Sequence, residues 1–261
     1  MPTKNNTCLN FSDSKFYAPL NTYVSEIISD QKMTKEDYIH ESNDMVSVEY
    51  LEQRDLERLK SLYSEECMED KVQKALILLK GDHRSYLNHQ ESDLILEAVE
   101  RVNNNPLYDL ARDQTFDLVT YLKENELKDI MEISPEALSA MNALAKGYLL
   151  DRDLESAFTL YQFLSYLDHY EPVFYQGMGL TYFFKEMYQE AIPHFSFAHQ
   201  LNPHLAFPLI NLCECHVALS DRVKAIETYE KAKRIMVEDS AQKEMFIRQM
   251  KDLRKKIKGA K

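Results

Sequence analysis

The sequence predicts an all-α protein built around a tetratricopeptide-repeat array of helical hairpins. Three observations support this prediction: a 34-residue repeat in the carboxy-terminal half, a low content of helix-breaking residues, and few segments with the period-two pattern of β-strands. Only 5 glycines and 8 prolines occur among the 261 residues. We therefore expect three repeats and a C-terminal capping helix, preceded by a helical N-terminal segment.

Composition and charge are those of an ordinary globular protein. Apolar residues make up 44% of the chain and charged residues 28%, close to the averages for globular domains. The formal net charge is −12, and residues 240–261 carry eight basic and two acidic residues, or +6, which leaves −18 for the remainder. Such a negative body argues against nucleic acid as the main partner.

The sequence shows no targeting or membrane segment. No apolar run approaches the roughly 18 residues that span a bilayer, and the first residues lack the apolar core of a secretory signal. We therefore expect a cytoplasmic protein that does not insert into membranes. The cysteines have no framework spacing and are expected to be reduced thiols; they are Cys8, Cys67, Cys213 and Cys215.

The N-terminal part shows a weaker pattern. Residues 1–40 are polar and without clear periodicity, so we expect partial disorder there. Residues 41–110 form the predicted helical extension, with one long helix over 45–80 and another over Asp93 to Val102. A third helix is expected near Thr115 to Leu122. Since no 34-residue register is present, this is an added segment and not further repeats.

The repeat consists of columns of like residues spaced 34 apart, which gives repeats at 138–171, 172–205 and 206–239 within a domain of residues 111–261. Small residues in two columns let the paired helices of a hairpin approach closely, and rings fill the space beside that contact. The columns are Ala145, Gly179 and Cys213; Tyr148, Tyr182 and His216; Ala157, Ala191 and Ala225; and Tyr161, Phe195 and Tyr229.

Turn residues and a final amphipathic segment set the boundaries of the array. Ser134-Pro135 and Glu171-Pro172 place a proline in the first turn of a helix, where its missing N–H costs nothing. The last repeat leaves an apolar face uncovered, so a capping helix over 240–261 is required. Its apolar residues are Met245, Ile247, Met250, Leu253 and Ile257.

The second repeat and its flanks carry a more specific pattern. Its segments are Leu127 to Ile130 (LKDI) followed by Ser134 to Glu136 (SPE), Leu164 to Pro172 (LSYLDHYEP), Phe174 to Leu180 (FYQGMGL) and Ala191 to Pro203 (AIPHFSFAHQLNP). Together these segments resemble the type III secretion chaperones of the SycD/LcrH/IpgC class, and the resemblance covers roughly residues 110–261.

The resemblance implies a bacterial chaperone that is not an enzyme and needs no cofactor. Such chaperones bind an extended segment of a secreted hydrophobic translocator protein in the concave groove lined by the first helices of the hairpins, and keep it soluble until export. A homodimer is a further expectation from the resemblance. The expected groove residues are Asn142, Lys146, Leu149, Leu167, Gln176, Leu180, Phe183, Phe207, Ile210, Asn211 and Val217.

Two departures from the family pattern leave points open. Asn142 and Leu149 stand where relatives have tyrosine, which leaves the preferred client open. The family members are little more than the repeat domain, whereas this chain adds about 110 residues before it. Dimerisation, a second client contact and a cover for the empty groove are all open roles for that segment.

Metal and catalytic sites are not expected from the remaining motifs. On one helix, Cys213 and Cys215 point about 200° apart and cannot chelate one ion, so Cys213 is interpreted as a packing residue. His194, His199 and His204 recur every five residues, which rotates them off a common face. The acidic turn at 151–155 lacks the glycine of a calcium loop, and Asp168-His169 lacks a nucleophile.

Other functional hypotheses remain beside the secretion chaperone. One alternative is a scaffold or regulatory protein, in which the same groove would bind a short cytoplasmic peptide. Another is an enzyme in residues 1–110, a hypothesis that no motif supports. Leu180, Phe183 and Ile210 could belong to the core instead of the groove. The basic tail is interpreted as a solvated capping helix in preference to a lipid or nucleic-acid contact.

Overall fold

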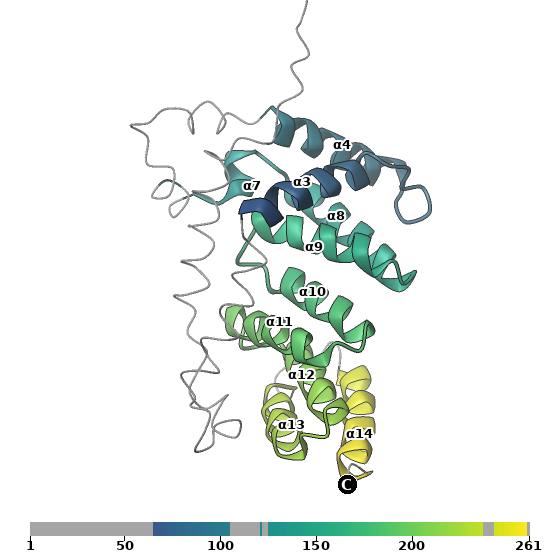
Figure 1. The fold of residues 1–261 in the computed structure, drawn as a ribbon, viewed down its shortest axis with the longest axis vertical. Helices are drawn as coiled ribbons and strands as arrows, with labels where there is room; N and C mark the ends of the chain where they lie inside the picture. The colour runs from purple at the N-terminus through teal and green to yellow at the C-terminus, as the bar shows by residue number, and fades with distance from the viewer. Residues whose placement is uncertain (1–64, 105–120, 122–124, 237–242, 260–261) are drawn as a thin grey trace, which may run out of the picture.

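The computed structural model describes residues 65–104, 121, 125–236 and 243–259, and within these ranges every regular element is a helix (Figure 1). The predicted fold class is therefore confirmed. The expected disorder of residues 1–40, the first part of the helix over 45–80 and the helix near Thr115 lie outside the described residues. The helices are α3 (Glu65–Leu79), α4 (His89–Asn103), α7 (Leu127–Ile130), α8 (Pro135–Leu150), α9 (Leu154–Leu167), α10 (Pro172–Phe184), α11 (Tyr188–Leu201), α12 (Ala206–Ala218), α13 (Arg222–Met236) and α14 (Lys243–Gly259).

Three helical hairpins stack one after another along the chain: α8 with α9, α10 with α11, and α12 with α13 (Figure 1). The first helices of the first two hairpins begin as expected, with proline at the first position. Ser134 Oγ accepts the Ala137 N–H at 3.1 Å, and the Glu171 carboxylate accepts the Val173 N–H at 3.2 Å. These caps satisfy backbone donors that a helix start leaves unpaired.

The 34-residue period is visible in the backbone of the turn inside each hairpin. Arg152, Glu186 and Ser220 have φ of 66°, 60° and 61°, the left-handed conformation that closes a helix end. In each turn the next N–H bonds the carbonyl five residues before it, at 2.9 to 3.0 Å. None of the three is glycine, so the helix pairing imposes this conformation against the preference of the residue.

Small residues allow the close helix contacts that the repeat predicted. A Cβ placed on Gly179 would lie 2.6 Å from the ring of Phe195, which is fully buried. In the third hairpin Cys213 takes the same place, and its Sγ lies 3.2 Å from the carbonyl oxygen of Ala225. The column of small residues therefore meets the aromatic column in the second hairpin and the column of alanines in the third.

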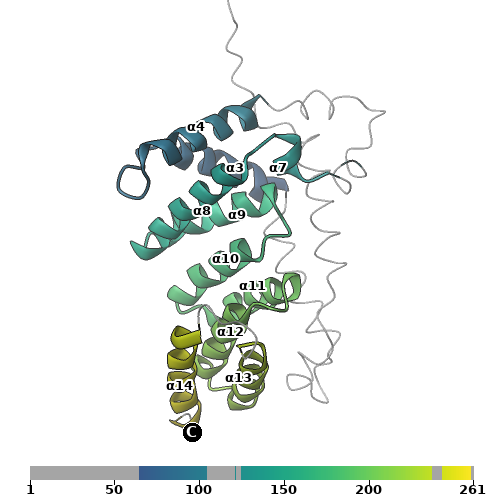
Figure 2. The same cartoon turned by 180° about the vertical axis from the view of Figure 1, so that it is seen from behind.

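The N-terminal pair α3 and α4 packs on the first hairpin, at the end of the stack opposite α14 (Figures 1 and 2). Helix α3 lies along α9 and α4 along α8. All residues of α9 from Ala157 to Leu167 are buried, and Lys71 of α3 holds its ammonium 5.6 Å from the ring centre of Phe158. This burial explains why α9 carries no charged side chain after Glu155.

Helix α4 begins earlier than the sequence predicted. It starts at His89 instead of Asp93 because Asn88 and Glu91 form a reciprocal capping box, with bonds of 2.9 Å and 2.8 Å. The helix runs antiparallel to α8, since Arg101 near its end contacts Glu132 before α8, while Tyr86 before its start contacts Asp151 after α8.

Helix α14 covers the last hairpin as the predicted cap. Met250, Leu253 and Ile257 are buried against α12 and α13. Ile247 differs from the expectation, because its side chain is 41% exposed and does not contribute to the covering face. In both views α14 lies at the end of the stack, beside α12 and α13 (Figures 1 and 2).

Replacing Gly179 with alanine should destabilise the array. In a helix interior alanine is more favourable than glycine by up to about 1 kcal/mol. The buried Phe195 ring cannot retreat, so overpacking outweighs this gain and we expect a net loss of about 1 to 3 kcal/mol. Urea unfolding monitored by circular dichroism measures this loss in the free energy of unfolding. Ser139→Ala, at an exposed position of α8, is the control; equal stability of both variants would contradict the close contact.

Candidate peptide-binding surface

The two cysteines of the third repeat, which resembled a metal site in sequence, are packed inside the protein. Within the described ranges, no group of three His, Cys, Asp or Glu side chains is placed to hold a metal ion. Cys213 and Cys215 are both buried, and burial raises the pKa of each thiol to about 12. Both therefore stay protonated and unreactive at neutral pH, and Cys213 packs between helices as the sequence predicted.

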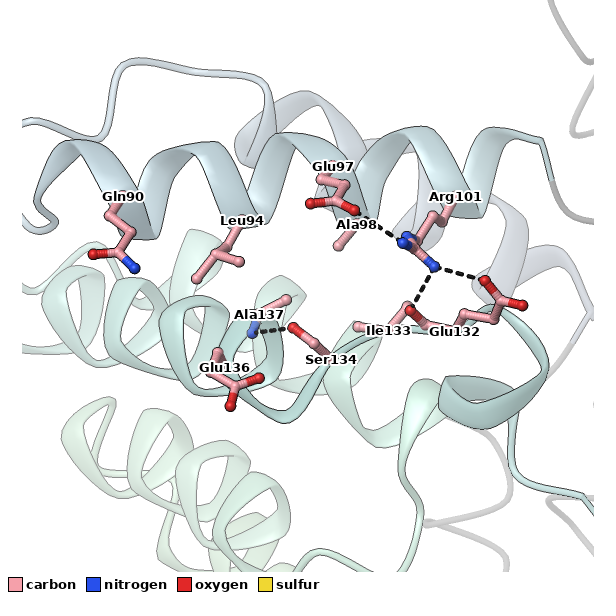
Figure 3. Close-up of a pocket in the computed structure, with 10 residues that line it drawn as sticks. All are labelled: Gln90, Leu94, Glu97, Ala98, Arg101, Glu132, Ile133, Ser134, Glu136 and Ala137. Atoms are coloured by element: carbon pink, nitrogen blue, oxygen red, sulfur yellow. Dashed lines mark hydrogen bonds and ion pairs between the residues drawn. The ribbon is translucent and has the colours of Figure 1, made fainter.

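A cleft of about 270 Å³ lies between α4 and the start of α8 (Figure 3). At one end of it lies Arg101, whose guanidinium donates to the carboxylates of Glu97 at 2.9 Å and Glu132 at 2.8 Å, and to the Glu132 carbonyl at 3.0 Å. Through these bonds Arg101 joins α4 to the turn before α8. In that turn Glu132 has a left-handed φ of 51°. The cleft is therefore part of the junction between the N-terminal pair and the array.

The candidate binding surface is the outward side of the first helices α8, α10 and α12, which we term the first-helix face. It carries large apolar side chains that the core does not enclose: Leu150 is 69% exposed and Val173 38%. Several more are half-buried, and they follow the 34-residue columns of the repeat. These are Leu180, Phe183 and Phe184 on α10 and Phe207 and Val217 on α12.

Most of the groove residues expected from the sequence contribute to this face. Lys146 is exposed, and seven others are half-buried. Leu149, Leu167 and Ile210 are buried, with 5%, 1% and 2% exposure, so they cannot touch a partner directly, and Leu167 lies at the end of the second helix α9. The half-buried residues are Asn142, Gln176, Leu180, Phe183, Phe207, Asn211 and Val217.

Three apolar residues of the first-helix face were not among the predicted positions: Leu150, Val173 and Phe184. The repeat itself contained the signal that finds Val173, which lies 34 residues before the predicted Phe207. Leu150 and Phe184 also lie 34 residues apart, but their column contains no predicted residue. Exposure was the missing information, because apolar residues on adjacent faces of a short helix look alike in sequence.

Contacts between the first two hairpins fix the end of this face. The Arg152 guanidinium lies 4.0 Å from the ring centre of Phe184, a cation–π contact from one hairpin to the next. Beside it, Lys185 donates to Glu155, and this hydrogen bond lowers the pKa of the Glu155 carboxyl. The half-buried Phe184 ring is thus held in place by a charged neighbour at the turn.

The block around Asp168 connects the first hairpin to the second. The Lys128 ammonium of α7 donates to Asp168 at 2.7 Å; burial would lower the pKa of Lys128, but the bonds to Asp168 and Glu126 outweigh it and raise that pKa. Asp168 also accepts the Tyr170 N–H at 3.3 Å, and Asn202, 34 residues later, makes the same turn with the His204 N–H at 3.1 Å. The block therefore has a structural role.

Comparisons with known proteins give similarity in fold only. No protein-family model matches the chain. A chain from the crystal structure of a T3SS complex from Aeromonas hydrophila is 20% identical with a TM-score of 0.48, covering 52% of this chain and 92% of that chain. A chain from the CopN-Scc3 complex is 18% identical with a TM-score of 0.45, covering 59% of this chain and 98% of that chain.

Acidification should destabilise the fold through His169 and His194. Burial lowers the pKa of His169 to about 4 and that of His194 to about 3, so both are neutral in the folded chain. In the unfolded chain each titrates near its ordinary pKa of about 6.5. Below that pH only the unfolded state takes up these protons. For each histidine the free energy of unfolding therefore falls by roughly 1 to 1.5 kcal/mol per pH unit, until the pH reaches the pKa of that histidine in the folded chain.

Urea unfolding at a series of pH values between neutrality and mild acid measures this dependence. His194→Phe, which keeps an aromatic ring beside Phe158 and Tyr182, should reduce the slope of stability against pH. Ser139→Ala, at an exposed position without a titratable group, should leave the slope unchanged. The same slope in all three proteins would show that His194 does not resist protonation.

Proposed function

We propose that this protein is a cytoplasmic chaperone of a bacterial type III secretion system that holds a hydrophobic translocator soluble until export. The first-helix face is its binding surface and takes an extended segment of the client. The observation that carries the proposal is the set of exposed and half-buried apolar side chains on α8, α10 and α12, in the same repeats that resemble translocator chaperones in sequence. The proposed activity is binding alone and needs no catalytic group.

The chemistry of the face suits an extended apolar segment. Leu180, Phe184 and Phe207 offer apolar area for alternate side chains of such a segment. Between them, the amide groups of Gln176 and Asn211 are half-exposed and can bond its backbone.

The expected affinity is moderate. Burying two or three apolar anchors contributes roughly 1.5 to 3 kcal/mol each, and part of this is offset by the cost of ordering the segment. The result is a dissociation constant near the micromolar range, which holds a client without preventing its release. The net charge of −12 adds repulsion between complexes and so limits their aggregation.

Two aspartates on the first-helix face should abolish client binding. Leu180→Asp with Phe207→Asp places charges where apolar anchors would lie, and both positions are only half-buried, so folding is retained. The control is Val223→Asp with Ile226→Asp on α13, where the side chains are 52% and 44% exposed. Tagged full-length protein is used to recover partners from the source bacterium, and the recovered client is then co-expressed with each variant.

The proposal requires a client with long apolar helices that is soluble with the wild type and the α13 variant but aggregates with the first-helix variant. Recovery only of partners without such helices would favour the scaffold hypothesis instead. A client held equally well by all three proteins would remove the first-helix face from the binding site. Circular dichroism checks that helical content is the same in each.

A further inference from the structure

The loop between α3 and α4, residues 80–88, reaches the edge of the first-helix face. Tyr86 in this loop lies against Gly147 of α8, so closely that a Cβ added to Gly147 would collide with its ring. The ring centre is 5.1 Å from that of Tyr148, and the hydroxyl donates to Asp151 at 2.8 Å. A residue from outside the repeats is thus anchored on the first repeat by three separate contacts.

The loop that carries Tyr86 is held by its own hydrogen bonds. The His83 carbonyl accepts the N–H groups of Tyr86 and Leu87, both at 2.9 Å, and the His83 ring contacts the Leu79 carbonyl at 2.9 Å. The bond to Asp151 raises the pKa of Tyr86 to about 12, so its hydroxyl remains a donor at neutral pH. The tyrosine is therefore positioned before any partner arrives, which reduces the ordering cost of binding.

The repeat register shows what Tyr86 replaces. The residues 34 and 68 positions after Gly147 are Thr181 and Cys215, which are buried at 1% and 0% exposure inside the array. The first hairpin has no preceding repeat, and at this position Tyr86 provides the cover. Glycine at 147 makes room for an aromatic ring where the later repeats have a side chain of their own.

Tyr86 borders the exposed part of the first-helix face. It contacts Gly147 and Asp151, which are four residues apart and so lie on one side of α8. The neighbouring stripe of the same helix contains Lys146 and Leu150, both exposed, with Leu150 at 69%. A segment bound along the first-helix face meets the Tyr86 ring at the end of α8, next to an uncovered leucine.

We propose that Tyr86 is the end wall of the binding surface and forms, with Leu150, a pocket for an apolar side chain at one end of the bound segment. This inference rests on the proposed function and assigns one role to the added N-terminal segment, a client contact. The pocket is apolar on both walls, and Lys146 beside it favours an acidic neighbour of the anchor. The partner is thus an extended segment that ends in a leucine-sized anchor.

The test is a coupling measurement with designed peptides. The probe is a fluorescein-labelled peptide of serine and glycine with leucines at its two ends and its middle, and variants in which each leucine in turn is serine. Fluorescence anisotropy gives the affinity of each peptide for full-length wild type and for Tyr86→Ser. We expect Tyr86→Ser to weaken the parent peptide about threefold or more, and to have no effect on the one peptide that lacks the end leucine facing Tyr86.

Two further variants separate the pocket from folding stability. Tyr86→Phe keeps the ring and loses only the bond to Asp151, so affinity should be preserved. Gly147→Ala leaves every proposed pocket residue in the sequence but displaces the Tyr86 ring, and should reproduce the loss seen with Tyr86→Ser. Ser139→Ala on the same helix is the matched control and should bind as the wild type does.

Each outcome bears on one of the two proposals. An equal loss of affinity for all four peptides would assign Tyr86 a purely structural role, and unchanged affinities would place it outside the site; both overturn the end-wall assignment and leave the first-helix face intact. If wild type bound none of the peptides, the first-helix face would not be a peptide site, and the proposed function would fall together with the pocket.

Discussion

The close contact between the two helices of each hairpin is the constraint on which the rest of the structure depends. Gly179 accepts the Phe195 ring against its backbone, and Cys213 lies against the Ala225 carbonyl in the next hairpin. When helices approach this closely their large side chains cannot interdigitate at the contact and are directed to either side of it. The position of every outward-facing residue on α8, α10 and α12 follows from this geometry.

The exposed apolar face is a consequence of how the hairpins stack. Second helices pack between neighbouring first helices, as the many contacts of α9 with α10 and of α11 with α12 show. The first helices therefore keep one side that the neighbouring hairpins do not cover. Charged groups at the turns, such as Arg152 on Phe184 and Lys185 on Glu155, hold this side in register without enclosing it.

The N-terminal pair changes the first hairpin from an exposed end into an enclosed one. Helix α3 covers α9, Arg101 joins α4 to the turn before α8, and Tyr86 covers Gly147. A repeat array needs such cover at both ends because each repeat buries its apolar surface only on a neighbour. At the other end α14 has the same function with a helix from the opposite end of the chain.

The sequence by itself determined the helical class, the period of 34, the turn positions and the small residues at the helix contacts, because these depend on local chemistry repeated along the chain. It indicated Leu180, Phe183 and Phe207 as surface residues, yet it could not separate them from the buried Leu149, Leu167 and Ile210 or identify Leu150 and Phe184. Nor did it pair Tyr86 with Gly147, or α3 with α9. Such exposure and pairings depend on contacts between segments far apart in sequence, and only the tertiary structure decides which apolar side chains a neighbour covers.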